Sequence, residues 1–166
     1  MNFSTLFRLR ENLNLDKKTL VILRWIAIVG QLTAINLVYF VLKLDFPILI
    51  AHFVLLIGFA TNLYLQIGIR SIILKDLKAS IFLIYDLFQL AGLLYLTGGI
   101  SNPFSILMII PTIVSSTFLN LRSTFFLSIL TAMMLGVLTL YHLPLPNPGN
   151  LHFHVPDYYL SLIHIS

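Results

Sequence analysis

The heptapeptide GGISNPF carries the turn-forming and polar chemistry that the rest of this apolar chain lacks. Gly98 and Gly99 can adopt a positive φ, which lets the chain reverse direction. Asn102 precedes a proline, so we expect its backbone to be extended while its side chain caps the following helix. Pro103 suits the first helical turn, where no N–H is required. We expect unpaired N–H groups at this positive helix end, beside the ring of Phe104.

These groups suit a flat ligand that has carbonyl oxygens and a lipid tail, such as a quinone. The N–H groups and the Asn102 amide would donate to the oxygens, and the Phe104 ring would stack on the head group. The alternative is that the heptapeptide is only an efficient short loop. The residue spacing leaves both interpretations open.

Two charged residues lie inside long apolar runs, where an unpaired charge is costly. Arg24 lies about 6 Å and Asp86 about 10 Å from the ends of their runs, at a rise of 1.5 Å per residue. We expect an ion pair between them that ties the run at about residues 20–42 to the run at about residues 79–96, and a proton relay is the alternative. Gln31, Asn62 and Gln89 are expected to form hydrogen bonds between helices, with ligand contact as the alternative.

The histidines do not form a recognisable metal site. His152 and His154 could bind a metal together with Asp157, but we interpret them as solvated loop residues and predict no metal. His52 and His142 raise the alternative of a b-type haem, although their expected depths in the membrane differ. No catalytic residue is predicted.

The composition indicates an integral membrane protein, because 58% of the 166 residues are hydrophobic and 10% are charged. The long apolar runs do not alternate between apolar and polar residues, which excludes a transmembrane β-barrel and predicts helices. The predicted fold is an all-α polytopic membrane bundle with five complete transmembrane helices and a truncated sixth that starts near Tyr158. The five runs cover about residues 20–42, 46–67, 79–96, 103–119 and 124–143. Pro111 is expected to kink or loosen the fourth run.

Positive charge predicts the orientation, since cytoplasmic loops are enriched in Lys and Arg. Nearly all such residues precede the odd-numbered runs, namely Arg8, Arg10, Lys17, Lys18 and Arg24, then Arg70, Lys75 and Lys78, then Arg122. The amino terminus is therefore expected to be cytoplasmic, with GGISNPF on the opposite side. The net charge of +4 lies beside membrane segments, so it does not predict a nucleic-acid partner.

We divide the chain into a cytoplasmic lead (residues 1–19), a transmembrane domain (residues 20–159) and a tail (residues 160–166). The lead is not expected to be a cleavable signal peptide, because its basic part is long and no small-residue cleavage site follows. The tail LSLIHIS matches the translation of a transposon end used in sequencing libraries. We interpret it as adapter-derived, and a natural chain end is the alternative.

GGISNPF resembles the GGxxNPF heptapeptide of the RegB/PrrB/ActS family of redox-responsive sensor histidine kinases. The residues that match its fixed letters are Gly98, Gly99, Asn102, Pro103 and Phe104. The flanking stretches DLFQL (residues 86–90) and LLYLT (residues 93–97) are similar to the third span of the family, and LRW (residues 23–25) with Gly30 and Gln31 resembles the first. The resemblance extends to about Tyr159.

The resemblance implies a six-span sensor in the bacterial inner membrane that binds ubiquinone at the heptapeptide. It also implies a homodimeric parent protein whose cytoplasmic kinase phosphorylates a response regulator. This chain has no phosphoacceptor helix, ATP-binding lobe or cysteine, so it is not expected to be a kinase by itself. Two other functions remain open: a small quinone- or haem-binding subunit of a respiratory membrane complex, and a membrane scaffold that has no ligand.

Overall fold

The computed structural model describes residues 15–41, 43 and 45–143, and its regular elements are helices. In chain order they are α2 (Lys17–Asn36), η1 (Leu37–Val41), α3 (Ile48–Gly68), α4 (Asp76–Leu96), η2 (Gly99–Ser101), η3 (Pro103–Ile109), α5 (Ile110–Phe118) and α6 (Leu121–Leu140). η1 is a π-helical continuation of α2, and η2 and η3 are 3₁₀ helices. The all-helical fold predicted from the sequence is confirmed for this part of the chain.

Four of the described helical segments are long and apolar enough to cross a membrane: Lys17–Val41, Ile48–Gly68, Asp76–Leu96 and Leu121–Leu140. Pro103–Phe118 is a shorter apolar helix at the position of the predicted fourth span. The predicted sixth span lies outside the described residues. The same holds for most of the lead, for His152, His154 and Asp157, and for the tail at residues 160–166.

The Pro103–Phe118 segment, called here the fourth segment, begins as a 3₁₀ helix and continues as an α-helix. Pro111 has no N–H to give to the carbonyl of Leu107, and the N–H of Ile110 bonds that carbonyl instead. The seven 3₁₀ and nine α residues reach about 27 Å at their respective rises. Because a 3₁₀ helix is the longer form per residue, this short segment approaches the thickness of the bilayer hydrocarbon.

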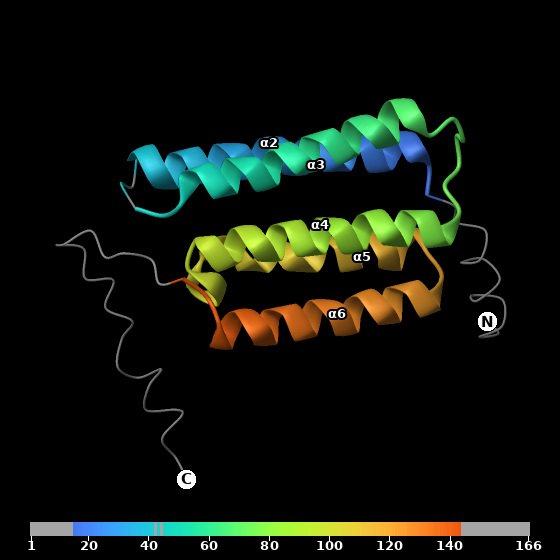
Figure 1. Cartoon of the computed structure of the whole chain (residues 1–166). Coiled ribbons are helices and arrows are strands. Elements are labelled where there is room, and N and C mark those ends of the chain that lie inside the picture. Colours follow the sequence, from blue (N-terminus) through green and yellow to red (C-terminus); the bar gives the residue numbers. More distant parts are fainter. Residues whose placement is uncertain (1–14, 42, 44, 144–166) are drawn as a thin grey trace, which may run out of the picture.

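The helices form two groups that lie one above the other (Figure 1). α2 and α3 make an antiparallel pair, and α4 packs with α5 and α6 in the second group, while α3 also contacts α4. Leu87, Leu94 and Met108 are fully buried within the second group. α6 contacts η2, so the reversal after α4 lies at the same end of the bundle as the end of α6.

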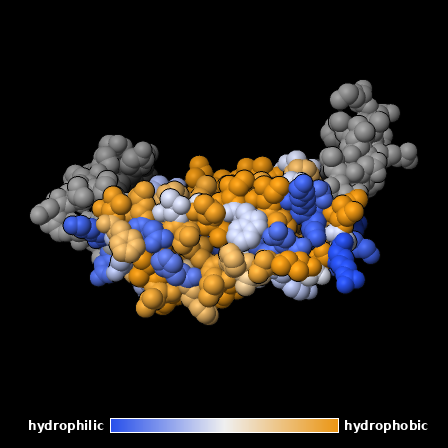
Figure 2. Space-filling view, turned by 90° about the horizontal axis from the view of Figure 1, so that it is seen from above, coloured by the Kyte–Doolittle hydropathy of each residue, from blue (hydrophilic) through white to orange (hydrophobic). Residues whose placement is uncertain are grey.

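Large apolar side chains cover the outside of the bundle, as expected for a lipid-facing surface. Figure 2 shows apolar side chains across the middle of one face, with hydrophilic side chains gathered mainly towards its two ends. Ile26, Phe53, Phe125 and Leu140 are among the exposed residues. This distribution is typical of a protein that spans a membrane.

Polar contacts close the end of the bundle opposite the heptapeptide. Asp76 Oδ1 accepts a hydrogen bond from the Asn120 N–H at 2.9 Å, and Asp76 Oδ2 accepts one from Ser123 Oγ at 2.5 Å. Lys17 Nζ donates to the carbonyl oxygens of Gln66 and Ile69 at the end of α3. One carboxylate and one ammonium group thus fix the start of α4 and the end of α3 to their neighbours.

Candidate functional site

The heptapeptide forms the tight reversal that the sequence predicts. Gly98 and Gly99 have φ values of 100° and 60°, which are strained for residues with a Cβ. Asn102 is extended, and its Oδ1 accepts a hydrogen bond from the Phe104 N–H at 2.9 Å, so it caps η3 as expected. Pro103 occupies the first turn of that helix.

The amide of Asn102 is used within the turn and is not free. Asn102 Nδ2 donates to Thr97 O at 3.0 Å and to Thr97 Oγ1 at 2.9 Å, and the side chain is 6% exposed. The backbone N–H of Asn102 donates to Gly99 O, and that of Ser101 donates to Gly98 O. The expectation of unpaired donors at this turn is therefore not met for the Asn102 amide, which bonds Thr97, or for these two N–H groups, which form bonds of the 3₁₀ type.

The turn is also packed against the end of α6, a contact that the sequence does not predict. A Cβ added to Gly99 would lie 2.5 Å from Cγ of His142. The His142 ring is held by a contact between its Nδ1 and Leu138 O at 2.9 Å. The N–H of Leu143 donates to Tyr95 O at 2.9 Å. His142 thus has a packing role at the turn.

A lateral groove of about 320 Å³ connects the turn with the interior of the bundle. It runs between α2 with η1 (Leu20 to Val38), α4 and its cap (Leu83 to Thr97) and the stretch from Asn102 to Val114. The ring of Phe104, 38% exposed, is one of its walls. Apolar side chains and one glycine make up most of the lining. The polar residues in the lining are Arg24, Gln31, Asp86, Thr97 and Asn102.

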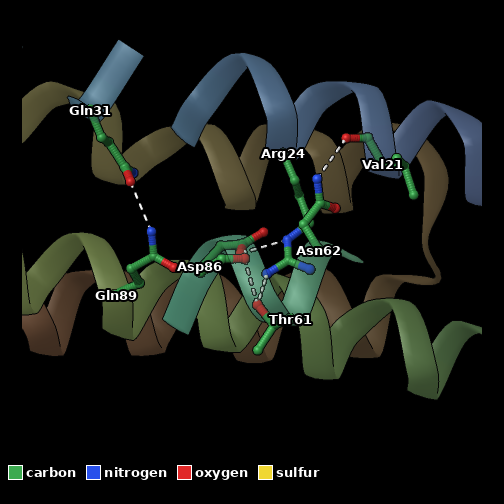
Figure 3. A network of polar contacts seen from close by, with 8 residues as sticks. Val21, Arg24, Gln31, Thr61, Asn62, Asp86 and Gln89 are labelled. Atoms are coloured by element: carbon green, nitrogen blue, oxygen red, sulfur yellow. Dashed lines mark hydrogen bonds and ion pairs between the residues drawn. The ribbon is translucent and has the colours of Figure 1, made fainter. Parts of the chain in front are cut away.

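Arg24 and Asp86 form the ion pair that was expected between the first and third runs (Figure 3). Arg24 Nε donates to Asp86 Oδ1 at 2.9 Å, and a second guanidinium nitrogen donates to Thr61 Oγ1 at 2.9 Å. The guanidinium carbon also lies 5.2 Å from the ring centroid of Phe82 and 5.5 Å from that of Tyr85. Arg24 is 3% exposed and Asp86 25%, so the pair joins α2, α3 and α4 in a largely buried position.

Two further polar contacts cross between helices, as the sequence predicts. Gln89 Nε2 donates to Gln31 Oε1 at 2.9 Å, and Asn62 Nδ2 donates to Val21 O at 3.3 Å (Figure 3). Gln89 lies so close to Gly58 that a Cβ at this glycine would overlap the amide. In the described part of the chain, three buried side-chain atoms have no hydrogen-bond partner, namely one terminal guanidinium nitrogen of Arg24, Asn62 Oδ1 and Gln89 Oε1.

The histidines considered for haem belong to different helical groups. His52 is on α3, and its Nδ1 contacts Ile48 O at 2.9 Å. His142 follows α6 and contacts the turn, as described above. Within the described residues, no cluster of three or more His, Cys, Asp or Glu side chains could hold a metal ion. No observation on these residues favours the respiratory-subunit interpretation.

Similarity to known proteins extends over most of the chain. A family profile described as a PilS-like transmembrane domain matches residues 18–165. The sensor histidine kinase RegB of Cereibacter sphaeroides is 35% identical over 132 residues, which is 77% of this chain and 28% of that relative. The chain therefore spans little more than a quarter of the length of this curated relative. No solved structure matches the chain.

Proposed function

The chain belongs to the family of PilS-like transmembrane domains and is a membrane domain of the RegB type, and we propose that it senses quinone for a histidine kinase. In this proposal, ubiquinone or a related quinone binds beside the turn at Gly98, Gly99, Asn102, Pro103 and Phe104. Its redox state is passed to a cytoplasmic kinase and then to a response regulator. The full-length kinase acts as a homodimer in the inner membrane, with the amino terminus in the cytoplasm.

The observation that supports this proposal most directly is the position of Asn102 and Phe104 in the wall of the lateral groove. The groove is lined mainly by apolar side chains with a few polar groups, which is typical of small-molecule sites, and its volume falls at the lower end of their range. Exposed walls such as Ile26 and Ile110 open it to the lipid side, where an isoprenoid tail can lie. The Phe104 ring supplies an aromatic surface for the head group.

Signalling requires that the two redox forms of the ligand favour different arrangements of the helices. The groove has walls from both helical groups, since α2 belongs to one and α4 and α5 to the other. A ligand that binds between them would change how the two groups pack. The ion pair of Arg24 with Asp86 joins the same two groups, so it would carry part of any such rearrangement.

The test is quinone binding by the chain in lipid nanodiscs, with Phe104→Leu compared with Phe126→Leu. Phe126 is an exposed phenylalanine of α6 that does not line the groove. Phe104→Leu should weaken binding several-fold because a stacking surface is lost, and Phe126→Leu should leave the affinity unchanged. If wild type and Phe104→Leu bound the quinone equally well, the heptapeptide would not be the site.

A further inference from the structure

Quinone carbonyl oxygens need hydrogen-bond donors, and the turn offers few. The Asn102 amide donates to Thr97, and the N–H groups of Ser101, Asn102 and Phe104 are bonded within the turn. The turn residues that line the groove are Thr97, Asn102 and Phe104, and the Thr97 N–H also has a partner, Leu94 O. A ligand beside Phe104 must therefore find its donor elsewhere in the groove. The polar residues of its lining outside the turn are Arg24, Gln31 and Asp86.

Gln31 is the groove residue that has a donor to spare. Its Oε1 accepts the hydrogen bond from Gln89 Nε2 at 2.9 Å. Among the described residues, Gln31 Nε2 has no hydrogen-bond partner, and the side chain is partly exposed in the groove. A free amide donor at this depth is costly, since the surrounding hydrocarbon has no water to satisfy it. A bound ligand with an acceptor oxygen would remove this cost.

Arg24 is less suited to the same role, although it also lines the groove. Its guanidinium group already donates to Asp86 and Thr61 and lies over the rings of Phe82 and Tyr85. Its unpartnered nitrogen is buried and out of contact with solvent. The amide of Gln31 is neutral and reachable, so it matches an uncharged carbonyl oxygen better than the paired cation does.

We propose that Gln31 Nε2 donates a hydrogen bond to a carbonyl oxygen of the quinone in the lateral groove. The inference rests on the proposed function and adds a binding residue on α2 to it. Gln31 is opposite Gln89, which precedes Thr97 by eight residues, or about 12 Å along α4. The head group would then lie lengthwise in the groove, with its ring near Phe104 and one oxygen directed towards α2. The ligand thereby touches both helical groups.

Two substitutions separate direct binding from helix packing. Gln31→Met and Gln89→Met both abolish the hydrogen bond between α2 and α4, and Met is an unbranched side chain of similar length. Only Gln31→Met also removes the groove donor, because Gln89 does not line the groove. Asn36→Met is a further control on the same element α2, since the Asn36 amide bonds Leu32 O of its own helix and is outside the groove.

The affinity for ubiquinone should be measured for each variant in nanodiscs, with thermal stability recorded in parallel. We expect Gln31→Met to weaken binding about tenfold, as for one lost hydrogen bond, and Gln89→Met and Asn36→Met to bind within about twofold of wild type. Equal losses in Gln31→Met and Gln89→Met would overturn the inference, because they would assign the effect to helix packing.

Failure of the inference is distinguishable from failure of the proposed function. If the wild-type chain binds ubiquinone and Gln31→Met binds it equally well, Gln31 is not a ligand residue, but the sensor function stands. If the wild-type chain does not bind ubiquinone, both proposals fall. A photoreactive quinone that labels the full-length protein on α2 and the fourth segment supports the site. If the label were confined to another face of the protein, lipid or a protein segment would fill the groove instead. That result would overturn the proposed site.

Discussion

The ring of His142 lies directly against the backbone of Gly99, so a Cβ at this glycine would be 2.5 Å from His142 Cγ. Gly99 also has a φ of 60°, which residues with a Cβ rarely adopt. Close packing therefore holds the heptapeptide against the end of α6, while hydrogen bonds within the turn and to Thr97 hold its shape. Any ligand beside the turn meets a surface whose position depends on this contact.

Gly99→Ala should destabilise the chain by about 1–3 kcal/mol, because the new methyl group combines a strained φ with an overlap at His142. The measurement is thermal unfolding in detergent micelles or nanodiscs. Gly92→Ala is the matched control, since a Cβ at Gly92 in α4 meets no atom within 4 Å. There the change should be neutral or stabilise the helix by up to about 1 kcal/mol.

Removing the ring separates the two causes of the Gly99→Ala effect. In the double variant Gly99→Ala, His142→Ala, the overlap is gone and the backbone strain remains. The double variant should therefore lose about 1 kcal/mol less unfolding free energy than the sum of the losses in the two single variants. Strict additivity would mean that His142 does not pack on Gly99.

Arg24→Met should cost about 3 kcal/mol of stability, the lower end of the range for removing one partner of a buried ion pair. Asp86 would be left without its cation in a groove of mainly apolar lining. Arg122→Met, at an exposed position near the start of α6, should change stability by less than about 0.5 kcal/mol. Denaturation of the three proteins in the same micelles measures the difference.

The double variant Arg24→Met, Asp86→Leu tests whether the pair acts as a unit. Replacing both charges with apolar groups removes the unpaired carboxylate, so this protein should be more stable than Arg24→Met alone. If the double variant were less stable than either single variant, each charge would have important partners outside the pair, and Thr61 would be the first to examine.

The ion pair and the turn could be predicted from the sequence. An unpaired charge in an apolar run is energetically costly, and the turn residues have local backbone preferences. A charge such as Asp86 in an apolar run must find a partner of opposite charge at similar depth, and Arg24 meets that condition. Gly98 and Asn102 have backbone preferences that do not depend on the rest of the fold.

The features that sequence reasoning missed depend on which residues the packed helices bring together. His142 covers Gly99 because α4 and α6 end at the same place. The Asn102 amide bonds Thr97, five residues earlier, only because the turn folds back on the end of α4. The 3₁₀ geometry of Pro103–Ile109 was missed as well, since Pro111 predicts a disturbed helix but not its form. Hydrogen bonds between helices were expected for Gln31 and Gln89, but neither their pairing with each other nor the unpaired donor of Gln31 was predicted.

Asp76→Ala should destabilise the chain by about 1–3 kcal/mol, because two hydrogen bonds to the start of α6 depend on one carboxylate. The N–H of Asn120 and the hydroxyl of Ser123 would both lose their acceptor. Asp45→Ala is the control, since Asp45 is an exposed acidic residue in the preceding part of the chain. Hydrogen exchange should show faster exchange at Asn120 in Asp76→Ala only, and equal exchange in all three proteins would contradict this role.

Pro111→Ala should shorten the fourth segment by about 3 Å. The new N–H at position 111 can bond the carbonyl of Leu107, which allows the seven residues of η3 to become α-helical with a smaller rise. The chain has no cysteine, so spin labels can be placed on cysteines introduced at Ile100 and Thr117, both exposed. The distance between the labels measures the segment. Pro103→Ala is the control, because a proline in the first turn replaces no helical hydrogen bond. If Pro111→Ala left the distance unchanged, the 3₁₀ form would be imposed by the Asn102 cap and by packing of Met108 against α4 and α6, and Pro111 would only tolerate it.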